Sequence, residues 1–144
     1  MIRKDLRNIN PELRSFKEIF LDKNLAKIGD IFVNFIYSIS KSIVINKITG
    51  EKVAGKILMQ ALRDSDLNQY VPARLTKHDI ADAVEALIFY VWALNLMKFN
   101  EMIDILVSEL SMGDFSTRTN EFDTAILAFT KLLNKISELN IFDK

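Results

Sequence analysis

Three carboxylates in two separate segments are the residues of this chain best suited to chemistry. Asp30 ends the sequence LAKIGD, and Asp82 and Glu85 stand near the start of IADAVEALIFYVW, which becomes apolar on every side. A helix that is apolar all round is usually buried. The i, i+3 spacing of the second pair puts both acids on one face of that helix. Burying them is costly unless they are paired, protonated or bound to a cation.

Small residues beside these acids predict that the two segments cross closely. Gly29 precedes Asp30, and three alanines flank the second pair, namely Ala81, Ala83 and Ala86. A glycine inside a helix costs about 1 kcal/mol relative to alanine, which makes sense where another backbone packs on it. At such a crossing the three carboxylates would converge, and oxygen ligands in that number suit Mg²⁺ or Mn²⁺. A divalent ion held there would activate water for attack on a phosphodiester.

A plainer interpretation of the same acids stays open from spacing alone. In it, Asp30 pairs with Lys27 or Lys77, while Asp82 and Glu85 face solvent. The two interpretations differ in whether the two segments meet.

The composition predicts one all-α domain over residues 1–144. The chain is 49% hydrophobic and 26% charged, with 4 Gly and 2 Pro. So few helix breakers favour long helices with short connections. The chain has no Cys, which excludes disulfides and thiolate metal sites. Its 19 basic and 19 acidic residues cancel, which counts against binding a polyanion by bulk charge but permits a local basic rim.

No feature of the sequence predicts secretion or a membrane partner. The first sixteen residues, MIRKDLRNINPELRSF, are charged and lack the apolar region of a signal peptide. The longest unbroken apolar run, 86–94, is far shorter than the roughly 20 residues of a membrane span. We therefore expect a soluble, cytoplasmic protein.

Apolar periodicity places the helices. Asn10 before Pro11 is expected to cap the first helix, and Asn24 the second. A turn is expected at 46–50, and a loop with a short helical turn at 66–76. The expected helices cover approximately residues 11–22, 25–45, 51–65, 77–97, 100–112 and 119–140.

The two acidic segments resemble a known family. LAKIGDIFVNFIYS is similar to the signature helix of ribonuclease III domains, L-E-x-L-G-D followed by an apolar run. IADAVEALIFYVW is similar to the second acidic helix of that family, A-D-A-F-E-A-L-I-G-x-x-Y. The order, the separation and the helical context match over roughly residues 20–100. The nearest likeness is to compact archaeal and Mini-III-type members without a double-stranded RNA-binding domain, which similarly read KIGD…KHD…DAxEA.

The resemblance implies a homodimer of endonuclease domains with a ribonuclease III helical fold. Asp30 matches the signature aspartate, and Asp82 and Glu85 match the acids of the second motif. All three are therefore candidate catalytic residues and ligands of Mg²⁺ or Mn²⁺, with Glu85 the one most tied to catalysis. In the family, ion-bound water attacks an RNA phosphodiester and leaves a 5′-phosphate and a 3′-hydroxyl. The implied partner is double-stranded or structured RNA, with no DNA expected.

Two departures from the family pattern bear on activity. Ala26 stands where the pattern has a glutamate, so one ligand is missing, and Asn34 on the same face is a candidate neutral oxygen. Only about 45 residues follow the central helix, and they are expected to form two helices. Duplex binding would then come from the catalytic domain or from a partner.

Duplex RNA is recognised by shape, through phosphates and 2′-hydroxyls. Basic residues near the acids are the candidates for this contact, although a solvated helix face is the plainer interpretation of most of them. The aromatic group around Trp92 is expected to be core or dimer interface. The RNA-binding candidates are Lys52, Lys56, Arg63, Arg74, Lys77 and His78.

Three functional hypotheses follow. The leading one is a metal-dependent endoribonuclease that cleaves double-stranded or structured RNA, with RNA processing, including that of ribosomal RNA, as its task. The alternative is a catalytically inactive protein of the same fold that binds structured RNA or a ribonucleoprotein. The third is a structural helical dimer whose acids are salt-bridged, which predicts no ion binding and no salt-dependent RNA binding.

Overall fold

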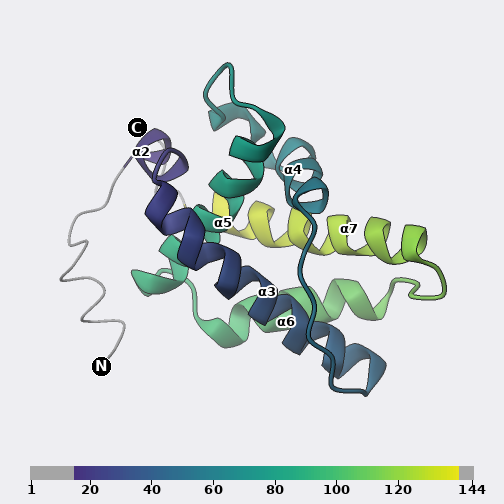
Figure 1. The fold of residues 1–144 in the computed structure, drawn as a ribbon. Helices are drawn as coiled ribbons and strands as arrows, with labels where there is room; N and C mark the ends of the chain where they lie inside the picture. Colours follow the sequence, from purple (N-terminus) through teal and green to yellow (C-terminus); the bar gives the residue numbers. More distant parts are fainter. Residues whose placement is uncertain (1–14, 140–144) are drawn as a thin grey trace.

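A computed structural model describes residues 15–139, and over this range every regular element is a helix (Figure 1). The prediction of an all-α fold is confirmed. The elements in order are α2 (Phe16–Phe20), α3 (Lys23–Ile45), α4 (Gly55–Asp64), the 3₁₀ helix η1 (Asp66–Tyr70), α5 (Lys77–Ala93), α6 (Phe99–Ser111) and α7 (Arg118–Ser137).

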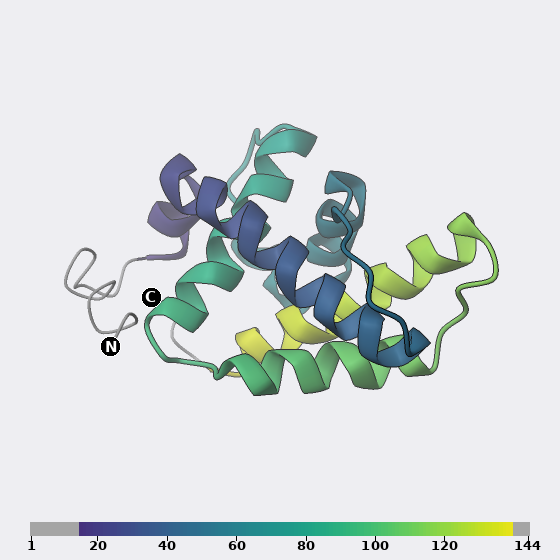
Figure 2. The same cartoon turned by 60° about the horizontal axis from the view of Figure 1, so that its bottom comes forward.

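Helix α5 lies at the centre of the fold. Most of its residues are buried all round the helix, as the apolar run predicts. Helix α3 packs most extensively against α5, while α2 and α4 cover other parts of it. Helices α6 and α7 pack against each other, and Figure 2 shows them running together along one side of the molecule. The long apolar helix therefore holds the second acidic motif inside the protein.

Side-chain caps set several of the helix starts, and one expected cap is wrong. Asp22, and not Asn24, caps α3: its carboxylate accepts the backbone N–H groups of residues 24 and 25, each at 3.0 Å. Ser15 caps α2 in a capping box with Glu18. The expected cap at residues 10–11 lies outside the described residues. Thr76 caps α5 through a second capping box.

Two predicted boundaries shift for backbone reasons. Helix α5 ends at Ala93, four residues early, because Asn95 adopts a left-handed conformation with φ 61°. Helix α4 begins at Gly55, later than the predicted 51, because the preceding residues are extended and tied to α3.

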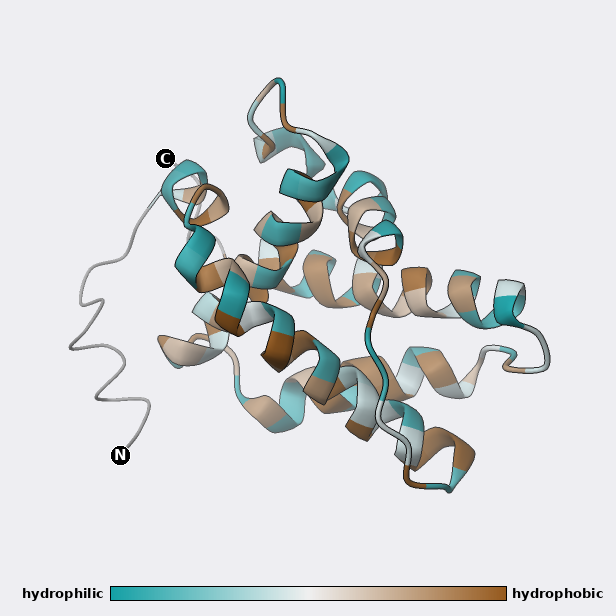
Figure 3. Ribbon diagram, in the orientation of Figure 1, coloured by the Kyte–Doolittle hydropathy of each residue, from teal (hydrophilic) through white to brown (hydrophobic). Residues whose placement is uncertain are grey.

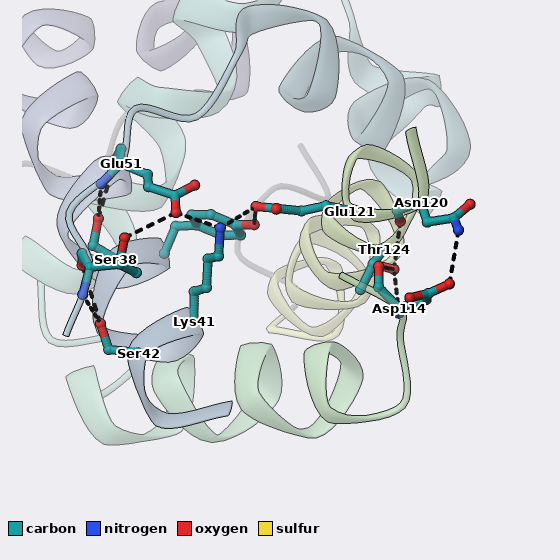
Figure 4. A network of polar contacts seen from close by, with 10 residues as sticks. Ser38, Lys41, Ser42, Glu51, Asp114, Asn120, Glu121 and Thr124 are labelled. Atoms are coloured by element: carbon teal, nitrogen blue, oxygen red, sulfur yellow. Dashed lines mark hydrogen bonds and ion pairs between the residues drawn. The ribbon is translucent and has the colours of Figure 1, made fainter. Parts of the chain in front are cut away.

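The extended segment 46–54 is fastened to α3 by polar contacts (Figure 4). Ser38 accepts the backbone N–H of Glu51 at 2.8 Å, and Ser42 accepts that of Thr49 at 2.9 Å. The buried ammonium of Lys41 pairs with Glu51 and, at 2.7 Å, with Glu121 at the start of α7. This network holds the segment 46–54 in place, and with it Lys52 and Val53, which lie beside the middle of α3.

Helix α3 is apolar on more than one side. Among residues 15–139 it alone has the length and mean hydropathy, 1.4, of a membrane-spanning helix, and 33% of that stretch is buried. Figure 3 shows hydrophobic residues recurring along it. Ile28, Phe35 and Ile43 follow the helical apolar period, yet they are 42%, 55% and 55% exposed. Ile31 is 71% exposed.

Helices α3 and α5 touch through their backbones. A Cβ atom built on Gly29 would lie 2.2 Å from the carbonyl oxygen of Glu85 and 3.1 Å from the nitrogen of Ala86. No side chain fits there, so only glycine permits this approach. The predicted crossing of the two acidic segments is therefore observed.

Replacing Gly29 by alanine should lower the free energy of unfolding by about 3 kcal/mol, because the new methyl group would force two buried backbones apart. Urea unfolding followed by circular dichroism measures this. Gly55→Ala is the matched control, since its Cβ would meet only the Cβ of Ala81 at 3.5 Å. Its stability should be unchanged or raised by up to about 1 kcal/mol. Equal stability of the two variants would contradict the close crossing.

Candidate active site

The helix crossing opens onto a cavity of about 410 Å³. Its acidic lining is Asp30 from α3 together with Asp82 and Glu85 from α5. The three carboxylates singled out in the sequence thus share one cavity. Four basic side chains, Lys23, Lys27, Lys52 and His78, also line it. The remaining lining residues are Ala26, Val53, Gly55 and Ala81.

Glu85 and Asp30 form a coupled pair at the crossing. Glu85 is 7% exposed. Burial raises the pKa of its carboxyl to about 8, and the hydrogen bond and charge of Asp30 act in the same direction. The hydrogen bond from Glu85 lowers the pKa of Asp30, as does the nearby Lys52. At neutral pH the pair therefore holds a proton on Glu85 and a negative charge on Asp30.

Asp30 is oriented by two further neighbours. The Asn34 amide donates to Asp30 Oδ1 at 3.3 Å, and Lys52 Nζ lies 3.4 Å from the same oxygen. Asn34 is itself held, because its Oδ1 accepts the backbone N–H of Val53 at 2.8 Å. The segment 46–54 thus supplies Lys52 directly and, through the N–H of Val53, holds Asn34 in place on α3. The amide oxygen of Asn34 accepts the backbone N–H of Val53, and its amide N–H donates to Asp30. Asn34 therefore positions Asp30 in this arrangement.

Asp82 has different partners. Lys23 Nζ lies 3.1 Å from Asp82 Oδ2, and His78 Nε2 lies 3.6 Å from it. Lys23 also contacts Asp79 at 2.9 Å. Sequence reasoning missed Lys23, because it stands 56 and 59 positions before these acids and belongs to no motif.

The plainer interpretation is wrong on two points. Asp30 pairs with Lys52 and not with Lys27 or Lys77, and Glu85 is buried rather than solvent-facing. Asp82 is 20% exposed and salt-bridged. The acids therefore meet across the two helices.

The acids of the cavity are of the ligand type that divalent ions prefer. In the arrangement described for residues 15–139, no group of three His, Cys, Asp or Glu side chains stands ready to hold a metal. Asp30 and Glu85 do form a coupled pair of carboxylates that share a proton in a cavity. Mg²⁺ is usually held through one or two carboxylates and keeps several waters. The pair Asp30 and Glu85 therefore matches the number and type of protein donors that such an ion needs.

Ala26 marks the missing donor. It is 5% exposed, lies one turn before Asp30 on α3 and lines the same cavity. A carboxylate at this position would point into the site. Its absence leaves the cavity with three acids and four basic side chains.

The RNA-binding candidates divide by position. Lys52 and His78 line the cavity itself. Lys56, Lys77 and His78 line an adjoining hollow of about 280 Å³. Exposed Arg63 at the end of α4 and Arg74, in a left-handed turn with φ 68°, line neither hollow. A basic margin thus extends from the cavity over the start of α5.

The aromatic group around Trp92 is packed. The Trp92 ring stacks on Phe32 with centroids 5.0 Å apart, and Phe89 meets Phe32 at 5.8 Å. Phe89 and Tyr90 are buried. This agrees with a core role and not with a base-stacking platform.

The chain matches a protein-family model. The model of the family described as Ribonuclease III matches residues 23–140, a range that contains α3, α5 and the whole cavity. No individually curated protein matches the chain.

The pH dependence of stability should report the coupled pair. Between the ordinary pKa of 4.5 and about 8, the native protein keeps on Glu85 a proton that the unfolded chain has lost. The free energy of unfolding therefore falls as pH rises through this window. Glu85→Gln should lose about 1–3 kcal/mol less between pH 5 and pH 8 than the parent protein. Urea unfolding in EDTA at several pH values measures how the free energy of unfolding changes with pH. Asp123→Asn, at an exposed position on α7, is the control. The same pH dependence in all three proteins would refute the coupling.

Proposed function

The chain belongs to the ribonuclease III family, and we propose that it is a divalent-metal-dependent endoribonuclease that hydrolyses phosphodiesters in double-stranded or structured RNA. Family membership supports a ribonuclease-like enzyme. The observation that carries the finer proposal is the coupled pair Asp30 and Glu85, set by a backbone crossing at a cavity with a basic margin.

The proposed division of work follows from the surroundings of each acid. Mg²⁺ or Mn²⁺ in this cavity would supply an activated water and charge stabilisation at the leaving oxygen. Asp30 and Glu85 would hold it, with Asp82 as the third donor. Glu85 must release its proton to act as a ligand, so ion binding and proton release are linked. Asn34 and Lys52 keep Asp30 ionised and aimed into the cavity.

The basic margin is proposed to hold the RNA. Lys52 and His78 stand beside the acids, where a scissile phosphate would sit. Lys56, Lys77 and Arg74 extend the positive surface over the start of α5 and would contact neighbouring phosphates. The chain is neutral overall, so this contact relies on local charge, and its affinity should fall with salt.

A homodimer is proposed from the exposed side of α3. Ile28, Ile31 and Phe35 are spaced at i, i+3 and i+7, which places them on one face of the helix, and all three are exposed. Phe35 lies 5.9 Å from the ring of Phe99 on α6, which extends the apolar surface. Contiguous exposed apolar surface marks an interaction site. A second copy of the chain would cover it.

A second candidate function is favoured by Ala26. With one acid fewer than the family pattern, the chain would be a catalytically inactive member that binds structured RNA or a ribonucleoprotein. In that case the basic margin would bind duplex RNA, and no cleavage would occur at any concentration of Mg²⁺ or Mn²⁺.

Cleavage of a labelled perfect RNA duplex in Mg²⁺ or Mn²⁺ separates the two functions. The parent protein should give defined products with 5′-phosphate ends. Glu85→Gln and Asp30→Asn should each reduce the rate at least on the order of 100-fold, because each removes an oxygen donor from the site. Duplex binding in EDTA and the folded state should be retained. Asp123→Asn should cleave like the parent; full activity of both site variants would remove the pair from the mechanism.

Phe35→Asp should convert a dimer into a monomer, since it places a charge in the proposed interface. We expect the dimer dissociation constant to rise roughly 30-fold or more. Sedimentation equilibrium measures this, with Leu127→Asp as control because Leu127 is 63% exposed on α7. A monomeric parent protein, or equal weakening by both variants, would count against this interface.

A further inference from the structure

Lys23 occupies a distinctive place in the cavity. It is the first residue of α3, and its ammonium bridges two acids of α5, at 2.9 Å from Asp79 and 3.1 Å from Asp82. Its side chain is 53% exposed, and that of Asp82 is 20% exposed. The same cavity contains Asp30 and Glu85. An internal cation therefore already sits on one of the three candidate metal ligands.

The two contacts of Lys23 differ in what else holds the acid. Asp79 is fixed independently, because its other carboxylate oxygen accepts the backbone N–H of Thr76 at 3.2 Å in the capping box of α5. The side-chain contacts of Asp82 within residues 15–139 are with the basic groups of Lys23 and His78. Asp82 is thus the freer carboxylate to turn, and Lys23 would remain anchored through Asp79.

The acids of the cavity have separate partners over residues 15–139. Asp30 and Glu85 are coupled to each other, while Asp82 is drawn to the ammonium. A divalent ion that takes Asp82 as a ligand must break the contact with Lys23. Two cations on one carboxylate repel each other, so binding of one opposes binding of the other.

We propose that Lys23 is an internal counter-ion that competes with the divalent ion for Asp82. Lys23 is a positioning residue: its ion pair holds Asp82 until a divalent ion displaces it. Its ammonium then stays at the cavity through its contact with Asp79. The inference rests on the proposed function, which places a divalent ion at this site.

The test is Mn²⁺ affinity in the absence of RNA, measured by electron paramagnetic resonance of free Mn²⁺ and by calorimetry. Lys23→Met should tighten Mn²⁺ binding roughly 3- to 10-fold, because a competing charge is removed. Lys23→Arg keeps the charge and should stay within about twofold of the parent. Lys131→Met, at an exposed position on α7, controls for net charge and should have no effect. Thermal melts in EDTA verify that each variant is folded.

A double-mutant cycle assigns the effect to Asp82. In an Asp82→Asn background, Lys23→Met should no longer tighten Mn²⁺ binding, because the contested carboxylate is gone. Unchanged or weaker binding by Lys23→Met would overturn the proposal, as would equal tightening in both backgrounds.

The cleavage assay distinguishes this failure from failure of the proposed function. A parent protein that cleaves RNA while Lys23→Met leaves Mn²⁺ affinity unchanged overturns the counter-ion role alone. An inert parent whose Mn²⁺ affinity rises in Lys23→Met supports the counter-ion role and counts against the nuclease.

Discussion

The contact between the backbone of Gly29 and the carbonyl of Glu85 is the constraint on which the rest of this structure depends. It lets α3 lie directly on α5, with no side chain between them. Asp30, which follows Gly29, and Glu85, which makes the contact, are both acids. The same approach that closes the core thus brings Asp30 against Glu85 and removes water from Glu85. The same contact therefore determines both the packing of α3 on α5 and the environment of the two acids.

Each acid of the cavity owes its state to a different neighbour. Glu85 keeps its proton because it is buried beside Asp30, whereas Asp30 stays charged because Glu85, Lys52 and Asn34 stabilise the anion. Asp82 is charge-paired by Lys23. With Glu85 protonated, two charged acids and three lysines line the cavity, so its lining carries no net negative charge before an ion enters. That is a physical consequence of replacing a fourth acid by Ala26 and surrounding the rest with lysines.

The Lys41 network extends this arrangement outward. Its pairing with Glu51 and Glu121 joins α3, the segment 46–54 and the start of α7 (Figure 4). Tyr37 donates to Glu121 at 3.0 Å, and burial raises the pKa of this phenol well above its usual range. The segment so held carries Lys52 to Asp30. The buried ionic cluster around Lys41, near the C-terminal end of α3, thus helps to position Lys52 beside Asp30.

Much of the fold was predictable from the sequence because helix formation is governed by local pattern. The scarcity of Gly and Pro gave long helices, and the apolar run of α5 gave a buried centre. The i, i+3 spacing of Asp82 and Glu85 placed them on one helix, and Gly29 indicated a close crossing. Helix ends were less predictable: the left-handed Asn95 stopped α5 early, and Asp22 displaced Asn24 as a cap.

Tertiary structure alone decided the partners of the acids and the faces that are covered. Lys23 meets Asp82 across 59 positions, and Lys52 meets Asp30 through an extended segment that no periodicity describes. Periodicity also marked Ile28 and Phe35 as apolar positions of α3, yet both are exposed. A sequence pattern defines the sides of a helix, but the neighbours that cover each side come from distant parts of the chain. Charge pairing and burial depend on those neighbours, so they appear only when the helices are packed.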